Sequence, residues 1–189
     1  MQLLRQLSHW VAKFEMALAA LMALFISVLI LVNVVSRALG MAIYWIDELA
    51  IYAMIWMTFL ATSVVIKKRQ TLAVTFLVDQ LPLRGRYCLA LFSDVMILGF
   101  ALLLAVLCYR WYDPWRLFQT GFDVMEYQSQ TFNFIYSENT NTLGLKKVWV
   151  WMCLPWVAFA LMIHSSVNVL DRLLSWRTPK AYEQKGTSA

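Results

Sequence analysis

The sequence predicts an all-α integral membrane protein with four transmembrane helices, short interfacial amphipathic helices and both termini in the cytoplasm. The first observation is composition, since 61% of the 189 residues are hydrophobic and only 14% are charged, unlike an ordinary soluble domain. The second is length, because a bilayer core about 30 Å thick is crossed by about 20 residues of helix. Four apolar runs have this length, at residues 16–36, 49–66, 87–109 and 148–170.

The third observation is the placement of the basic residues outside these runs. The N-terminal segment, the second connector and the tail together hold eleven Lys and Arg residues, whereas the first and third connectors hold five. Because cytoplasmic loops carry the excess of Lys and Arg, both termini and the second connector are expected in the cytoplasm. The basic residues behind the net charge of +5 flank the apolar runs, which indicates contact with the membrane surface. No nucleic-acid partner is expected.

Two segments beside the spans have the spacing of amphipathic helices. Residues 1–15 place apolar side chains on one helical face, which predicts an interfacial helix leading into the first span. That span exceeds the apolar part of a signal peptide, about 7 to 15 residues, so we expect it to be retained. In the second connector, residues 72–77 repeat the amphipathic pattern and Pro82 ends it, which predicts a second short interfacial helix.

The third connector, residues 110–147, is long and aromatic for a helical membrane protein. Because a structureless loop of this length is uncommon, either the third helix projects beyond the bilayer or part of the connector rests on the interface. The spans and connectors together are expected to form a single four-helix transmembrane domain over residues 1–180. Residues 181–189 are expected to be a disordered cytoplasmic tail.

A pair of opposite charges flanks the first connector. Arg37 follows the first span, and Trp45, Asp47 and Glu48 lead into the second at the same expected depth. Arg37 with Asp47 or Glu48 is a candidate clamp across this helical hairpin, because a charge near the membrane is stabilised when paired. The alternative is a set of solvated loop charges, for which ion pairs contribute only about 0–1 kcal/mol.

Asp94 is expected to be the only carboxylate well inside a span, and His164 lies at a matching depth on the fourth helix. Three interpretations remain open. Asp94 and His164 form a structural hydrogen bond, Asp94 contacts another subunit, or the two residues belong to a proton relay. In each case a buried Asp94 is expected to be neutral or to be met by a polar partner.

A few other side chains are candidates for binding or chemistry. Thr58 and Thr62 on the second span offer a small-residue surface for a partner helix, and the alternative is lipid-facing packing without a partner. The three cysteines lie inside apolar runs without metal-binding spacing. His9 and His164 differ in expected depth, which argues against bis-histidine haem ligation. We therefore expect no catalytic residues, no cofactor, no metal site and no enzymatic activity.

Between Val34 and Pro82 the chain carries an ordered set of motif residues: Arg37, Trp45, Asp47, Glu48, Trp56, Phe59-Leu60, Lys67-Lys68-Arg69 and Val78 to Pro82. This segment resembles the small membrane subunit, the DctQ-like or Q component, of tripartite ATP-independent periplasmic (TRAP) transporters. A second stretch, Thr142-Leu143-Gly144-Leu145 followed by Trp149 and Leu154-Pro155, is similar to the family's entry into its last span.

The resemblance implies a scaffold subunit of a sodium-coupled, secondary-active importer of organic acids, of the C4-dicarboxylate or sialic acid class, in a bacterial inner membrane. It implies a large multi-span M component as partner, moving in an elevator-type cycle, and a periplasmic substrate-binding P component. The flat interfacial helices would hold the chain against membrane lipid. The alternative function is a haem- or quinone-associated membrane anchor subunit of a redox enzyme, which the absorbance spectrum of the purified protein would distinguish.

The charge count generates a test of topology. A cysteine at position 120 is expected to react with a membrane-impermeant thiol reagent on intact cells, whereas a cysteine at position 70 is expected to react only after the cells are opened. The reverse pattern would overturn the orientation.

Overall fold

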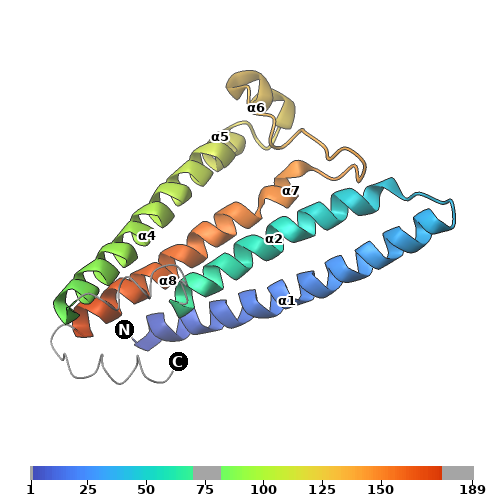
Figure 1. Ribbon diagram of the computed structural model, residues 1–189. Coiled ribbons are helices and arrows are strands. Elements are labelled where there is room, and N and C mark those ends of the chain that lie inside the picture. The colour runs from blue at the N-terminus through green and yellow to red at the C-terminus, as the bar shows by residue number, and fades with distance from the viewer. Residues whose placement is uncertain (1, 70–81, 176–189) are drawn as a thin grey trace.

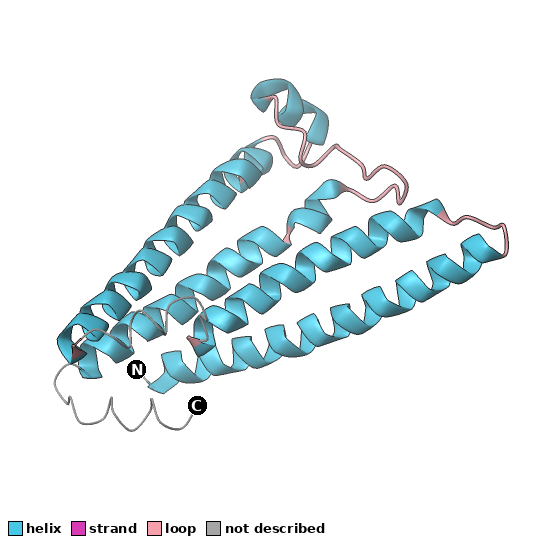
Figure 2. Ribbon diagram, in the orientation of Figure 1, coloured by secondary structure: helices cyan, strands magenta, loops and turns pink. Residues whose placement is uncertain are grey.

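The computed structural model describes residues 2–69 and 82–175, and confirms the all-α class. The four span-forming segments are α1 (Gln2–Ala38), α2 (Tyr44–Lys68), α4 (Leu83–Tyr112) and the pair α7 (Lys147–Trp151) and α8 (Cys153–Ser175). Each is long and apolar enough to cross a membrane, and each contains its predicted run. Two short helices, α5 (Pro114–Gln119) and α6 (Val124–Thr131), lie between α4 and α7, and no strand occurs among the described residues (Figure 2).

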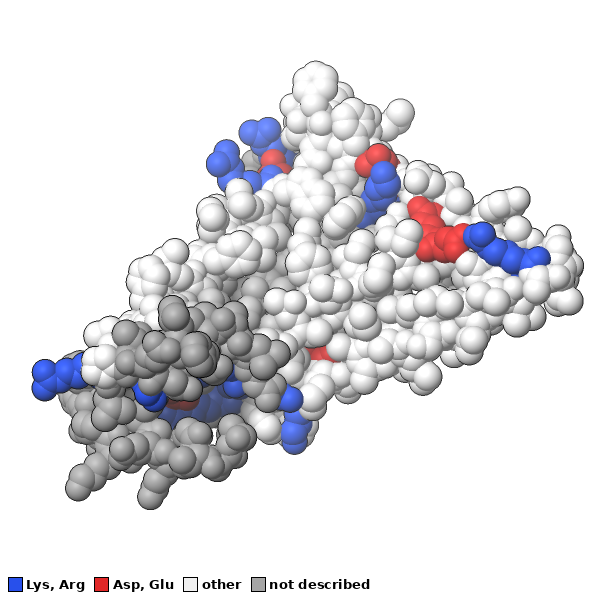
Figure 3. Space-filling model, viewed as in Figure 1, with Lys and Arg blue, Asp and Glu red and all other residues white. Residues whose placement is uncertain are grey.

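The spans form an open fan of helices (Figure 1). α1 packs on α2, α2 on α8, and α8 on α4, while the N-terminal turns of α1 also reach α8. α8 is therefore the central helix and the most buried of the four spans. Charged side chains on the face in Figure 3 lie mainly toward the two ends of the fan, with a broad uncharged region between them. This distribution suits helices whose middle sections face hydrocarbon.

The N-terminal segment is helical, as its spacing predicts, but it is continuous with the first span. α1 runs through 37 residues, about 55 Å, because no Pro or Gly interrupts it and its N-terminal turns pack on α8. The helix ends at a turn in which Gly40 has a φ of 75°, a left-handed conformation that glycine adopts at low cost. The interfacial helix expected over residues 72–77 and the tail at 181–189 lie outside the described residues.

The last span is interrupted at Met152, between α7 and α8. Pro155 explains the break, because proline has no N–H to donate to the carbonyl of Trp151 and its ring crowds that carbonyl. Two carbonyls of α7 accept side-chain donors from other helices instead. Trp56 Nε1 donates to Val150 O at 2.9 Å, and the Tyr112 hydroxyl donates to Val148 O at 3.2 Å.

The third connector is folded. α4 ends at Tyr112, three residues beyond the predicted run, because Asp113 adopts a left-handed φ of 40° and Pro114 then starts α5. The Asp123 carboxylate caps α6 by accepting from the N–H groups of Met125 and Glu126. A small apolar core forms beneath these helices from Tyr112, Ile135, Val148, Tyr136 and Trp151.

Candidate functional site

The polar side chains of the fan gather in three clusters, which are the candidate functional site. At the outer end, meaning the end that holds the first and third connectors, Arg37 donates to Asp47 at 2.5 Å, across the α1–α2 hairpin. Asn33 lies between them, accepting from Arg37 at 3.0 Å and donating to Asp47. Both charged side chains are about half exposed. The pair therefore contributes only about 0–1 kcal/mol, and its main effect is to fix the hairpin geometry.

Glu48 points away from Arg37 and binds the chain just before α7. Its carboxylate accepts from the N–H groups of Asn141, Thr142 and Leu143 at 2.8, 2.7 and 3.1 Å. The hydroxyls of Thr142 and Tyr52 also donate to it, at 2.5 and 2.8 Å. One carboxylate thus fastens the start of α2 to the approach to the last span, a contact that the sequence analysis did not foresee.

A signal for this contact was present in the sequence. The two stretches that carry the family resemblance, the acids at the start of α2 and Thr142 to Leu145, meet here in space. Gly144, with φ of 66°, closes the turn that aims the three N–H groups. Trp45, expected beside the acids, is about half exposed and makes no hydrogen bond to another described residue. Trp56 forms the tryptophan contact at this end.

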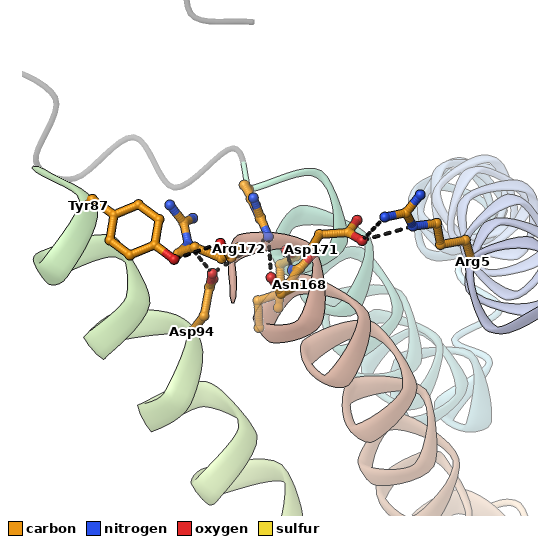
Figure 4. Close-up of polar contacts among 8 residues, drawn as sticks. Arg5, Tyr87, Asp94, Asn168, Asp171 and Arg172 are labelled. Carbon is orange, nitrogen blue, oxygen red and sulfur yellow. Dashed lines mark hydrogen bonds and ion pairs between the residues drawn. The ribbon is translucent and has the colours of Figure 1, made fainter. Parts of the chain in front are cut away.

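At the opposite, inner end, Asp94 is paired with arginine (Figure 4). Arg172 Nε donates to Asp94 Oδ2 at 2.5 Å, and both side chains are 7% exposed. A second guanidinium, that of Arg69, lies 3.6 Å from the same oxygen and donates to the carbonyl of Asn168. The Tyr87 hydroxyl donates to the carbonyl of Arg172 at 2.6 Å. Asp94 therefore joins α4, α8 and the end of α2.

Of the three interpretations of Asp94, the hydrogen bond to His164 is wrong, because Asp94 accepts from Arg172 and His164 contacts Ser8 and Glu15. His164 and Arg172 are eight residues apart on α8, which separates their directions by about 80° at 100° per residue. His164 consequently faces α1, while Arg172 faces α4. Arg172 lies just beyond the predicted run 148–170, but a long side chain on a helix leans toward the N-terminus and so reaches back to the depth of Asp94.

A third cluster lies between α1 and α8 and is fully buried. The Ser8 hydroxyl is 2.8 Å from His164 Nδ1, and Glu15 Oε2 is 3.3 Å from His164 Nε2. All three side chains are 0% exposed. The expectation that Asp94 is the only deeply placed carboxylate was therefore wrong, because α1 carries Glu15 into the interface. The usable signal was the spacing of Ser8 and Glu15, seven residues apart and so on one face of a helix.

The chemistry open to this third cluster is limited by its enclosure. A serine, a histidine and a glutamate are the residue types of a nucleophilic triad, but no substrate can reach a Ser8 hydroxyl that is fully buried. Both ring nitrogens of His164 are engaged, so neither is free to bind a haem iron. Within residues 2–69 and 82–175, no three His, Cys, Asp or Glu side chains are grouped to hold a metal ion.

Thr58 and Thr62 lie on the exposed side of α2. Each hydroxyl donates to a carbonyl one turn earlier, Thr58 to Met54 and Thr62 to Thr58, both at 2.8 Å. Their polar atoms are thus satisfied inside the helix, and what they present outward is a small, largely apolar surface.

Comparison with known proteins identifies what this arrangement resembles. The family described as tripartite ATP-independent periplasmic transporters, DctQ component, matches residues 26–175. A protein of Haemophilus influenzae named "Putative TRAP transporter small permease protein" is 33% identical over 98 residues, which span 51% of this chain and 60% of that protein. The family match contains the outer and inner clusters, and it contains His164 but neither Ser8 nor Glu15.

The inner cluster generates a test of stability. Asp94→Leu leaves Arg172 buried without its carboxylate, which is expected to destabilise the protein by about 3–5 kcal/mol, measured by unfolding in detergent micelles. The double variant Asp94→Leu/Arg172→Met removes both charges and is expected to recover most of the loss. As a control, Asp171→Leu breaks the exposed pair with Arg5 and should change stability by about 0–1 kcal/mol. Equal losses in the single and double variants would show that the pair does not fasten α4 to α8.

Proposed function

The chain belongs to the DctQ component family of tripartite ATP-independent periplasmic transporters, and from this premise we propose that it is the static scaffold subunit of such an importer. The observation that carries the proposal is the cross-bracing of the fan. Each pair of packed helices is fastened by polar contacts at one end or both, and these contacts hold the helices at fixed angles. A transport domain that moves needs a partner that keeps its shape, and a braced fan meets this need.

The bracing can be followed from helix to helix. Arg37 and Asp47 join α1 to α2 at the outer end, and Trp56 joins α2 to α7. At the inner end, the amide of Asn168 donates to the carbonyl of Ile66 on α2 at 3.0 Å, and Arg172 binds α4. The remaining contacts between α1 and α8 are the Arg5–Asp171 pair and the buried cluster of Ser8, Glu15 and His164.

The proposed partner is the large multi-span M component, with a periplasmic substrate-binding P component delivering the solute. The exposed face of α2 that carries Thr58 and Thr62 is our candidate for the contact with M, because small side chains let a partner helix approach closely. The Arg37–Asp47 pair then fixes the hairpin that presents this face, and Glu48 fastens it to the segment before α7. The exposed Trp45 beside them is a further candidate for docking to M. Asp94 and His164 have structural roles in the proposal, in holding α4 and α1 against α8.

The remaining parts of the proposal come from the family. We propose sodium-coupled symport of an organic acid, of the C4-dicarboxylate or sialic acid class, in an elevator-type cycle in which M moves and this subunit does not. The location is a bacterial inner membrane with both termini cytoplasmic. Support for this orientation is the excess of basic residues at the inner end, where α2 stops and α4 begins.

The first test concerns the hydrogen bonds that Glu48 accepts. Glu48→Ala removes an acceptor of five hydrogen bonds and frees the approach to α7 from α2. We expect a several-fold lower yield of the complex with M after affinity purification, and a matching fall in sodium-driven solute uptake. Glu126→Ala, which removes an exposed carboxylate of α6, is the control and should leave both unchanged. Wild-type yield and uptake in Glu48→Ala would contradict the proposed bracing role.

The second test concerns the contact surface. Thr58→Trp adds bulk to the exposed face of α2 without removing a buried group, so the subunit alone should unfold at the wild-type temperature while its co-purification with M falls several-fold. Val95→Trp, at an exposed position of α4, is the matched control. If Val95→Trp abolishes the complex and Thr58→Trp does not, the contact lies on α4 and the α2 assignment is wrong.

A further inference from the structure

α4 and α8 diverge toward the outer end and leave a hollow between them of about 410 Å³. Its floor is buried, with Cys108, Tyr112 and Ala158 all less than 9% exposed, whereas Tyr109 and Phe159 on its rim are more than half exposed. Almost all of the surface inside it is apolar. The feature is thus a groove with an enclosed floor and an open side, within the outer half of two spans.

The groove exists because small side chains face each other where the helices are held apart. Ala105 of α4 and Ala158 of α8 line it and leave its centre unfilled. It cannot collapse, because the Tyr112 hydroxyl donates to the carbonyl of Val148 at 3.2 Å and so props the outer end. Tyr136 closes the top by donating to the carbonyl of Tyr112 at 2.7 Å. Burial raises the pKa of Tyr136 to about 12, so its phenol stays protonated as the donor.

The apolar lining of the groove favours an apolar occupant over water. Water has no polar partners on such walls, and an empty space forfeits the dispersion contacts of its lining. The volume also limits the occupant. About 410 Å³ falls within the range of small-ligand sites, whereas an 18-residue helix about 10 Å across occupies about 2,000 Å³. A partner helix is therefore too large to enter, while a single acyl chain is narrow enough.

We propose that the α4–α8 groove binds one acyl chain of a phospholipid in the leaflet at the outer end of the fan, the end that holds the first and third connectors. The chain lies against Ala105, Cys108 and Ala158, and the glycerol region lies at the level of the exposed Tyr109. The hydroxyl of Tyr109 makes no hydrogen bond to another described residue, and tyrosine at a membrane interface typically directs its hydroxyl to lipid polar groups. The bound chain completes the packing between two helices that the protein itself does not fill. The inference concerns this chain alone and does not rest on the proposed transporter function.

The first measurement is how much phospholipid the purified protein retains. The protein is exchanged into detergent micelles that contain no phosphatidylethanolamine, and the lipid that stays bound is then measured by native mass spectrometry. The wild type is expected to retain one phospholipid. Ala105→Phe fills the groove from its wall and should lower the lipid-bound fraction several-fold. Val106→Phe adds the same ring at the neighbouring exposed position of α4 and should leave retention unchanged. A wild type that retains no phospholipid, or equal retention in the two variants, would overturn the proposal.

The second measurement needs no substitution and so decides the question if Ala105→Phe fails to fold. Cys108 lies on the groove floor and Cys88 is exposed, which makes Cys88 an internal control. Removal of lipid from the wild type should raise the rate of N-ethylmaleimide alkylation at Cys108 several-fold, and added phosphatidylethanolamine should reverse the change. The rate at Cys88 should not follow. An alkylation rate at Cys108 that is the same with and without phospholipid would contradict an occupied groove.

Discussion

The fold depends on one constraint, that a polar side chain inside hydrocarbon must find a partner. At the inner end of the fan, α8 supplies the partners that meet this constraint. Four of its polar residues, His164, Asn168, Asp171 and Arg172, fall within about 100° of arc, at 100° per residue. His164 and Asp171 are directed to α1, Asn168 to α2 and Arg172 to α4. Because each neighbour receives a different side chain, the polar residues of α8 fix the order of the other helices around it.

This arrangement explains why an open layer of helices can hold a defined shape. In a membrane, apolar contact between helices gives little preference over contact with lipid, so specific polar contacts decide which helices pack together. A buried charge pair depends on both of its partners more than an exposed pair does. Asp94 and Arg172 form the closest charge pair between α4 and α8, so removing either side chain takes from the other its nearest opposite charge. The outer pair of Arg37 and Asp47 is half exposed, so it sets geometry more than it adds stability.

The outer and inner ends of the fan differ in how they are held together. The inner end closes directly through side chains of adjacent helices, and the helices converge there (Figure 1). The outer end has direct contacts between helices as well, such as Arg37 with Asp47 and Tyr112 with the carbonyl of Val148. In addition, a connector takes part there, because the segment before α7 binds Glu48. These outer contacts hold α4 and α8 apart, and the α4–α8 groove lies in the space between them. The divergence of α4 and α8 thus leaves the apolar groove that we propose as a lipid site.

The sequence by itself determined the number of spans, their approximate limits and the family, because the length of an apolar run and the order of motif residues are local properties of the chain. It also placed Arg37 and Asp47 at the same end of the first two helices. Both residues lie within about five or six residues of the short turn between these helices, so the two side chains must be close to each other. What only the tertiary structure decided is which side chains meet between helices distant in sequence. A rotation of about 80° on α8 separates His164 from Arg172, and this rotation gave Asp94 an arginine as partner and left His164 to Ser8 and Glu15. Helix rotation and register are set by packing, so no local pattern in the sequence could specify these pairs.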